Sequence, residues 1–392
     1  MASIEKRGPN SYRLVIEIGY DADGKRIKKS KTVKVTTKRE AKKALAQFIA
    51  EYESGQYIEP EKMTFATFVT KWEEKYAKKH LSPVTLTTYK HQLKNHILPA
   101  LGHLPLAMIK PMHIVDFINC LEEDGKRKDG EMGRLSSASI LHVYRVMRDV
   151  FKRAVEWRLI KENIISYVKR PKITDQKQIE VYNEEEVAKL LLALERELPH
   201  WRIMITLSIT TGMRRGELLA LEWKHVDLEH GIIEIKQSLS HIKGKTMIKE
   251  PKTKKSTRKV AIPSALIPTI KKYYLQCRLE RELYDQWDSK PFFVFSSQNG
   301  KTFYYTVPST WLKRFFKRTG LRAIRFHDLR HTSATLLINQ GVHAKIIAER
   351  LGHADISTTM NIYGHALQSA DQSAADKLNT LLLAIQNKKI SS

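Results

Sequence analysis

The sequence predicts a multidomain chain: a small β-sheet plus one helix, then an all-α domain, then a mixed α+β but mainly α domain. Three observations predict it. Apolar and polar residues alternate within residues 1–57, as in strands. Residues 62–170 contain capped segments with helical spacing. After a polar linker at residues 168–182, capped helices and a few short strands fill the chain to residue 365.

The charge of the chain indicates a polyanionic partner. There are 68 Lys and Arg residues against 42 Asp and Glu residues, a formal net charge of +26. That excess predicts nucleic acid or an anionic membrane, and no apolar run approaches the roughly 18 residues that a spanning helix needs. The charged N-terminus shows no signal peptide, and the two cysteines, Cys120 and Cys277, fit a reducing cytoplasm. Nucleic acid is therefore the expected partner.

The N-terminal domain, residues 1–57, is the most basic part. Its strands are expected at residues 3–8, 11–20 and 26–35, with a turn at 21–25. Thr37 and Glu40 have the spacing of a capping box and predict a helix through about Tyr52.

Lys and Arg are concentrated on the predicted hairpin of this domain. Between Gly24 and Lys43 there are ten of them and one acidic residue. A two-stranded ribbon of this kind can enter a DNA major groove, whereas the alternative is a charged edge that discourages aggregation. The candidate DNA-binding residues are Arg13, Lys25, Arg26, Lys28, Lys29 and Lys31.

The middle domain, residues 62–170, is expected to contain four helices. They begin after Thr64, after Ser82 with Pro83 at the first helical position, at Pro111, and after Ser136 or Ser137, the last one running to Ile160. The polar stretch 124–134 is expected to be a loop. This domain alone predicts only a compact helical bundle, and a role in clamping DNA depends on its charge and neighbours.

The third domain opens with a helix capped by Asn183 and Glu186. Strands are expected at 231–239 and 257–263, on either side of a hairpin tip at 243–256, and at 291–295. Four clusters in this domain contain chemically active side chains.

The first cluster follows Gly212, which is expected to end a helix; Arg214 and Arg215 stand at the start of the next one. Free N–H groups at a helix start favour an anion, and an arginine there can bind a phosphate through two N–H bonds. Glu217 lies three residues after Arg214 and can orient it. The alternative is an ordinary surface ion pair.

The second cluster crowds five cations onto one hairpin: Lys252, Lys254, Lys255, Arg258 and Lys259. Their repulsion is unfavourable unless a polyanion lies beside them. A lysine in such a field could have a lowered pKa and donate a proton. The alternative is a purely electrostatic DNA contact, expected for Lys254 and Lys255, and the physics of the segment does not single out one lysine.

The third cluster pairs His327 with Arg330 at the i, i+3 spacing that puts both on one helix face. An imidazole beside a guanidinium can clamp phosphate oxygens. Asp328 is expected to cap the helix or orient a neighbour, and His331 to point elsewhere, as a packing or surface residue. A metal site is disfavoured because the spacing of the zinc-protease helix, His at i and i+4 with Glu between them, is absent.

The fourth cluster contains His353, in the turn after Gly352, and Tyr363 ten residues later. A phenol has a pKa of about 10, so it needs nearby cations and a base before it can attack phosphorus. The alternative is a structural tyrosine bonded to backbone. A rival interpretation of residues 332–353 is the helix-turn-helix of a transcription regulator.

In chain order these clusters resemble the catalytic set of the tyrosine recombinases, also called phage-type integrases. Members of that family carry an arginine after a Thr-Gly-x turn, a lysine on a β-hairpin, a His-x-x-Arg pair, a Leu-Gly-His turn and then a nucleophilic tyrosine. The matching residues here are Arg214, Lys252, His327, Arg330, His353 and Tyr363. The ordered set is much more specific than any single motif, and the resemblance covers essentially the whole chain.

The resemblance implies a domain order. Residues 1–57 resemble an arm-type DNA-binding domain, residues 62–170 a helical, SAM-like core-binding domain, and residues 175–365 the tyrosine recombinase catalytic domain. Residues 366–392 are expected to form a tail helix, because Ala374, Leu378, Leu381, Leu382 and Ile385 have helical spacing. Family tails often pack on a neighbouring subunit; the alternative is packing on its own domain.

The resemblance also implies a mechanism without a metal or other cofactor. Tyr363 would attack a backbone phosphorus, forming a 3′-phosphotyrosyl bond and freeing a 5′-hydroxyl. Arg214, Arg330 and His353 would hold the non-bridging oxygens. Lys252, with Lys254 as the competing choice, would protonate the leaving oxygen, and His327 would assist proton transfer.

The implied partners are double-stranded DNA, at core-type and arm-type attachment sites, and three further copies of the chain in a homotetramer. An excisionase and a DNA-bending host protein are expected from the family. The expected location is the cytoplasm of a bacterial host, with the protein bound to nucleoid DNA. No membrane is expected. Two other functions are considered: a type IB topoisomerase, disfavoured because simple relaxation needs no arm-type ribbon, and a non-catalytic regulator.

Overall fold

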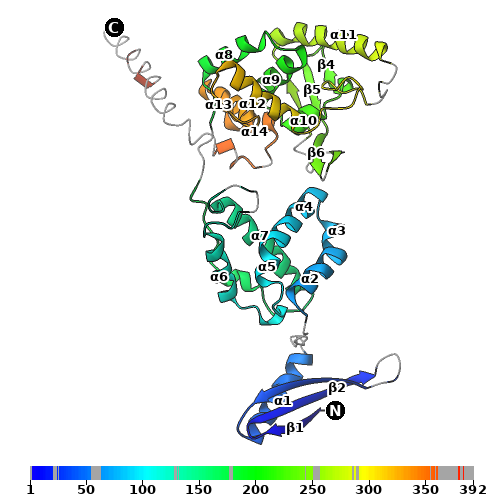
Figure 1. Cartoon of the computed structure of the whole chain (residues 1–392), viewed down its shortest axis with the longest axis vertical. Helices are drawn as coiled ribbons and strands as arrows, with labels where there is room; N and C mark the ends of the chain where they lie inside the picture. Colours follow the sequence, from blue (N-terminus) through cyan, green and yellow to red (C-terminus); the bar gives the residue numbers. More distant parts are fainter. Residues whose placement is uncertain are drawn as a thin grey trace, which may run out of the picture. The chain divides into compact units, whose positions relative to one another are not determined.

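The computed structural model describes residues 2–20, 24, 26–53, 63–127, 130, 132–175, 180–242, 244–249, 257–284, 287, 291–353, 355–357, 359–360, 378–379 and 383. The chain divides into two compact units, Met1–Gln176 and Lys177–Ser392, which are described separately (Figure 1).

The first unit begins with a three-stranded antiparallel sheet in the order β1-β2-β3, formed by Ala2–Gly8, Ser11–Tyr20 and Arg26–Lys34. Helix α1, Lys38–Glu53, buries Phe48 against Leu14 and Ile16 of β2. The capping box is present, because the Glu40 backbone N–H donates to Thr37 Oγ1 at 3.2 Å and the Thr37 N–H donates to Glu40 Oε2 at 3.2 Å. The predicted strands and helix of this segment are confirmed.

The rest of the first unit is helical around a core that includes Phe65, Trp72 and Phe151. Its elements are α2 Phe65–Trp72, a π-turn Glu73–Ala77, α3 Lys78–His80, α4 Pro83–Gln92, a π-turn Leu93–Ile97, α5 Leu98–Leu101, a 3₁₀ turn Leu106–Met108, α6 Pro111–Leu121, α7 Ser137–Glu156 and a 3₁₀ turn Ile164–Tyr167.

The predicted helix starts of this unit are confirmed. Thr64, Ser82 and Ser136 each accept the backbone N–H three residues later, at 3.2, 3.3 and 3.2 Å. One predicted end is wrong: α7 stops at Glu156 instead of continuing to Ile160. Arg158 adopts a left-handed φ of 57°, which a right-handed helix cannot contain.

The second unit comprises α8 Glu184–Leu194, α9 Pro199–Thr211, α10 Arg215–Leu219, a 3₁₀ turn Trp223–His225, β4 Val226–Asp227, β5 Ile232–Ile235, β6 Ser238–Ile242, β7 Lys245–Lys249, β8 Arg258–Ala261, a 3₁₀ turn Ser264–Leu266, α11 Ile267–Leu283, α12 Val307–Thr319, α13 Asp328–Asn339 and α14 Ala344–Leu351. The strands form a three-stranded sheet β4-β5-β8 and a separate two-stranded sheet β6-β7. Helix α9 is buried on most sides and packs against α8, α10, α11 and α13.

Two strand predictions in this unit are wrong. The stretch 231–239 divides into β5 and β6, because Gln237 turns its amide inward to the Ala220 carbonyl at 2.6 Å and to Glu222 Oε1 at 2.7 Å. The predicted hairpin tip therefore contains strand β7, which pairs with β6. Residues 291–295 form no strand, only a single bridge between Phe293 and Glu222, and their apolar character reflects burial.

Candidate active site

The ends of two helices bring the first cluster into contact with the fourth. Helix α9 ends at Gly212, whose φ of 65° is left-handed. A Cβ added there would lie 2.2 Å from Leu351 Cδ2 of α14, so the close approach of the two helices requires glycine. In Figure 1, α13 and α14 (orange) accordingly lie beside α9 and α10 (green).

Arg214 stands directly before α10 and is held by two groups. Its Nη1 donates to Glu217 Oε1 at 2.8 Å, and its Nη2 donates to the Gly352 carbonyl at 2.9 Å. The Arg214 backbone N–H also donates to Glu217 Oε2, at 2.9 Å. The prediction that Glu217 orients Arg214 is therefore confirmed. Arg215 has a different role, since its guanidinium stacks 3.9 Å from the Tyr305 ring centroid.

Arg330, in the first turn of α13, is a buried cation. Its side chain donates from Nη1 to the Gly212 carbonyl at 2.7 Å, and the residue is only 3% exposed. Within the described part of the chain its Nη2 is buried and has no hydrogen-bond partner. Burial, followed by the charge of Arg214, lowers the pKa of Arg330 to about 9. A buried guanidinium with an unpaired N–H group is suited to bind an anionic ligand.

His327 lies beside Arg330, as the i, i+3 spacing predicts, but His331 does not point elsewhere. The rings of His327 and His331 meet edge to face, with centroids 4.9 Å apart, because residues at i and i+4 share a helix face. The residue is partly exposed to solvent, yet surrounding protein atoms desolvate the ring. That desolvation, then His331 and Arg330, lowers the pKa of His327 to about 4.

Asp328 binds Arg325. Its carboxylate accepts the Arg325 backbone N–H at 2.9 Å and both ends of the Arg325 guanidinium at 2.8 and 2.9 Å. Of the two expectations for Asp328, it therefore meets the second, orienting a neighbour, because no side-chain hydrogen bond caps the start of α13.

His353 follows Gly352, the left-handed residue that ends α14. Its Nδ1 is 2.7 Å from the Thr359 hydroxyl oxygen. Burial, followed by the charges of Arg330 and Arg214, lowers the pKa of His353 to about 3. Because Arg214 donates to the Gly352 carbonyl and Arg330 to the Gly212 carbonyl, the described parts of the first, third and fourth clusters lie together.

Arg258 also lies in this site, a position that sequence reasoning missed. The sequence places it with the lysines of the basic segment, but its side chain is only 6% exposed and makes an ion pair with Glu217, Nη2 to Oε2 at 2.9 Å. Alternation along β8 was the available signal, since Arg258 is on the same face as buried Val260, whereas Lys259 is on the solvent face. Burial alone would raise the pKa of Glu217, but Arg258 and Arg214 outweigh it and lower that pKa.

Several predicted site residues lie outside the described residues: Lys25, Lys252, Lys254, Lys255 and Tyr363, together with Ala374, Leu381, Leu382 and Ile385 of the expected tail. The arrangement of Lys252 and Tyr363 around the arginines therefore stays a prediction.

The described N-terminal cations lie on two faces of the sheet. Arg13, Arg26 and Lys28 share the face that α1 leaves open: Arg13 donates to Ser30 Oγ at 3.1 Å, and the other two pair with Glu17 at 3.5 and 3.2 Å. Lys29 and Lys31 are paired with Ile16 and Leu14 on the α1 side. The Lys31 Nζ lies 5.8 Å from the Phe48 ring centroid.

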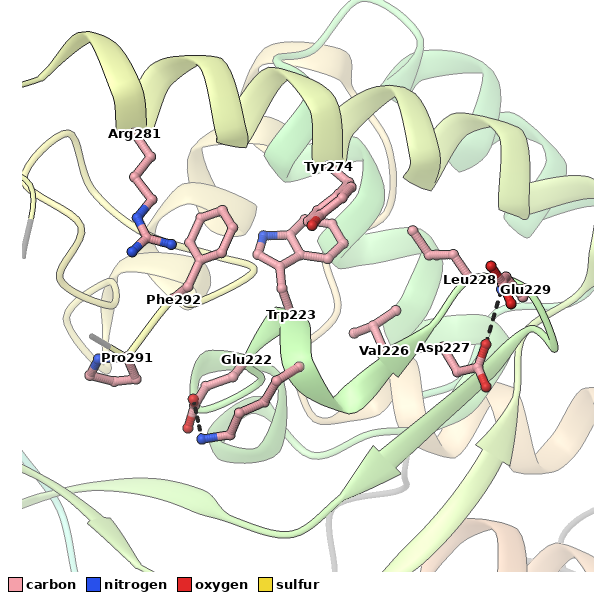
Figure 2. A pocket seen from close by; sticks show the side chains of 11 residues that line it. Glu222, Trp223, Val226, Asp227, Leu228, Glu229, Tyr274, Arg281, Pro291 and Phe292 are labelled. Carbon is pink, nitrogen blue, oxygen red and sulfur yellow. Dashed lines mark hydrogen bonds and ion pairs between the residues drawn. The ribbon is translucent and has the colours of Figure 1, made fainter. Parts of the chain in front are cut away.

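A separate pocket lies elsewhere in the second unit. It has a volume of about 1000 Å³ and is lined by aromatic residues Trp223, Tyr274 and Phe292 (Figure 2). Arg281 stacks 4.9 Å from the Phe292 ring centroid, and Glu222 pairs with Lys224 at 2.6 Å. The arginines and histidines of the four clusters do not line it.

Among the described residues, no helix is sufficiently long and hydrophobic to traverse a bilayer. In the same part of the chain, no group of three or more His, Cys, Asp or Glu side chains is arranged to hold a metal ion.

Known sequences match the chain over nearly all of its length. A profile described as "Phage integrase family" matches residues 180–370, and one described as "Phage integrase, N-terminal SAM-like domain" matches residues 64–121. A XerC-like tyrosine recombinase of Caldanaerobacter subterraneus subsp. tengcongensis is 29% identical over 96% of this chain and 98% of its own length. The ICEBs1 integrase of Bacillus subtilis is 27% identical over 97% of this chain and 100% of its own.

Solved structures match as well. The Tn1549 transposon integrase in complex with a circular intermediate DNA has a TM-score of 0.65 at 20% identity, covering 81% of this chain and 99% of that one. A lambda integrase dimer bound to a core site has a TM-score of 0.56 at 20% identity, covering 76% and 95%. At these identities the likeness shows a shared fold, mostly helical with small β-sheets.

Proposed function

The chain belongs to the phage integrase family, and from that membership we propose that it integrates and excises a mobile element or prophage by tyrosine-type site-specific recombination. The observation that carries the proposal is the buried guanidinium of Arg330, whose Nη2 has no partner among the described residues, beside Arg214 and His353. A DNA backbone phosphate is the anion that such a site fits.

In the proposed reaction the Tyr363 oxygen attacks the scissile phosphorus. The phosphorus stays bonded to the 3′-oxygen of the DNA and forms a new bond to the tyrosine oxygen, while its bond to the 5′-oxygen breaks. Arg214 and Arg330 hold the non-bridging oxygens and offset the charge that develops on them in the transition state. Lys252 supplies the proton that the leaving 5′-oxygen takes up. Because the phosphodiester energy is kept in the phosphotyrosyl bond, no nucleotide cofactor is needed.

The two histidines take part in neutral form. With pKa values of about 4 and about 3, His327 and His353 carry no charge near pH 7 before DNA binds. A neutral His327 can accept the proton that Tyr363 releases. If the Thr359 hydroxyl donates to His353 Nδ1, the hydrogen of His353 sits on Nε2 and can be donated to a phosphate oxygen.

The remaining assignments follow from the family and from charge. Residues 1–57 bind arm-type DNA, with the open sheet face of Arg13, Arg26 and Lys28 as the described part of that surface. Residues 62–170 and 175–365 each bind core-type DNA, and the tail, 366–392, packs on a neighbouring subunit of a homotetramer. An excisionase and a DNA-bending host protein set direction, in the cytoplasm of a bacterial host on nucleoid DNA.

A denaturing-gel assay tests the reaction directly. The full chain is mixed with a duplex carrying a nick near the scissile phosphate, in EDTA, and covalent adduct is resolved on a denaturing gel. Wild type should give a shifted band and Tyr363→Phe none. Tyr167→Phe, which removes the hydroxyl of an exposed tyrosine in the first unit, is the matched control and should keep the band.

One observation favours the regulator as a second candidate. Helices α13 and α14 pack as a helix-turn-helix through Ile338 and Leu351. The first turn of α13, however, holds Arg330 inside the arginine cluster. A regulator would bind duplex DNA and give no adduct with the nicked substrate. A topoisomerase would give the adduct but would not join two different duplexes.

A further inference from the structure

Arg258 joins three parts of the site. Its Nε donates to the Arg350 carbonyl at the end of α14, at 2.7 Å. Its Nη1 and Nη2 donate to Glu217 of α10, at 3.2 and 2.9 Å. It is also the first residue of β8, directly after the segment that contains Lys252. One side chain therefore connects α10, the end of α14 and the first residue of β8.

Glu217 creates an electrostatic conflict that Arg258 resolves. The carboxylate orients Arg214, but a buried carboxylate beside a guanidinium also cancels its charge, and Glu217 is only 5% exposed. A phosphate approaching a neutral Arg214–Glu217 pair would meet little attraction. With Arg258 added, the three groups carry one net positive charge, so the orienting carboxylate is compensated from within the protein.

The contacts of Arg258 also fix how Arg214 is held. Arg258 spans both Glu217 oxygens, and the side chain of Arg214 contacts only Oε1. The second anchor of Arg214 is the Gly352 carbonyl, in the turn that lies against Arg258. A Cβ added to Gly352 would come 2.9 Å from Arg258 Nη1, so the backbone of the turn packs directly against the guanidinium.

The geometry points to Arg258 as a positioning residue for DNA cleavage, which offsets the charge of Glu217 and sets Arg214 and His353 at the same phosphate. This inference rests on the proposed function, because it assumes that the phosphate is cleaved there. A direct DNA contact is disfavoured because Nε, Nη1 and Nη2 of Arg258 all donate to protein acceptors, whereas Nη2 of Arg330 has no partner among the described residues.

A double-variant experiment tests the charge argument. Arg258→Gln leaves Glu217 free to neutralise Arg214, and the rate of adduct formation at saturating DNA should fall on the order of 10²-fold. Adding Glu217→Gln to that variant removes the uncompensated carboxylate and should restore part of the rate. In the wild-type background Glu217→Gln should instead slow the reaction, because it leaves two adjacent arginines without their anion. Glu217→Gln is thus expected to slow adduct formation in the wild-type background and to speed it in the Arg258→Gln background.

The matched control is Arg322→Gln. Arg322 also spans a carboxylate, Glu186, at 2.7 and 2.8 Å and donates to a carbonyl, that of Val181, at 2.7 Å. Its variant should lower the melting temperature without changing the adduct rate of the folded protein. If Arg258→Gln gives no melting transition, Arg258→Lys, which keeps the charge and loses the fork, is compared with Arg322→Lys and should be about tenfold slower.

The outcomes separate the two proposals. If wild type forms no adduct, the proposed function fails. If wild type forms adduct, any one of three results would show that Arg258 has no positioning role. Folded Arg258→Gln could form adduct at the wild-type rate, or adding Glu217→Gln to Arg258→Gln could slow adduct formation further. In the third, Arg258→Lys forms adduct at the same rate as Arg322→Lys.

Discussion

Replacing Arg330 with methionine should stabilise the DNA-free protein while abolishing cleavage. The pKa of Arg330 falls from 12.5 to about 9 in the folded chain. Because the group is a base with a lowered pKa, the folded state disfavours its charged form, and the penalty is fully present near pH 7. At about 1.4 kcal/mol for each pH unit, this difference corresponds to roughly 5 kcal/mol.

The variant also loses a favourable contact. The Gly212 carbonyl, 2.7 Å from Arg330 Nη1, would lose its donor, at a cost of about 1–3 kcal/mol. The net expectation is a gain of about 2–4 kcal/mol, equivalent to roughly 4–16 °C for a unit of this size. Scanning calorimetry of the full chain, following the transition of the second unit, measures it.

Arg322→Met is the control because its guanidinium is paired. Glu186 raises the pKa of Arg322, so the folded state favours that charge and the variant should melt at a lower temperature. The reasoning is refuted if Arg330→Met melts below wild type, or if the two variants shift the melting temperature in the same direction.

Two further predictions concern pH and packing. The pKa of His327 is lowered from 6.5 to about 4, so the unfolded chain binds the proton first and stability should fall as the pH drops from about 6.5 to 4. His327→Gln should reduce the slope of that part of an equilibrium-unfolding profile, to which other histidines with lowered pKa values also contribute; an unaltered slope would contradict the assignment. Gly212→Ala should destabilise the second unit by more than the roughly 1–2 kcal/mol of a left-handed alanine, because its Cβ would meet Leu351 at 2.2 Å. Gly320→Ala, with φ +70° and open space, should show the backbone penalty alone in the same denaturant melts.

Sequence reasoning succeeded where the interaction is local. The caps at Thr64 and Asn183 act within three residues, and so does the pairing of Arg214 with Glu217. Residues three or four positions apart on a helix, or at its cap, lie close together almost independently of tertiary context. These contacts can therefore be predicted from the sequence alone.

It failed where the partner is distant in the chain. Arg258 meets Glu217 across 41 residues and Arg350 across 92, and no spacing rule connects them. A basic hairpin predicts exposed charge, so an arginine turned inward among four lysines was assigned with them. The inward turn of Gln237 is similar, since its partners belong to the chain that follows α10.

The bonds of these arginines explain how the site stays positive. Arg330 donates to the Gly212 carbonyl at the end of α9, and Arg350 to the Thr210 carbonyl in the same last turn. At the end of α14, Arg214 donates to the Gly352 carbonyl and Arg258 to that of Arg350. The last carbonyls of a helix have no partner within it and carry partial negative charge. They can therefore orient a guanidinium without cancelling its full charge, as a carboxylate would. Glu217 is the one carboxylate that pairs with Arg214 among the described residues, and it is shared with Arg258. The fold thus orients its cations largely with dipoles, and the positive charge that remains is available to a phosphate.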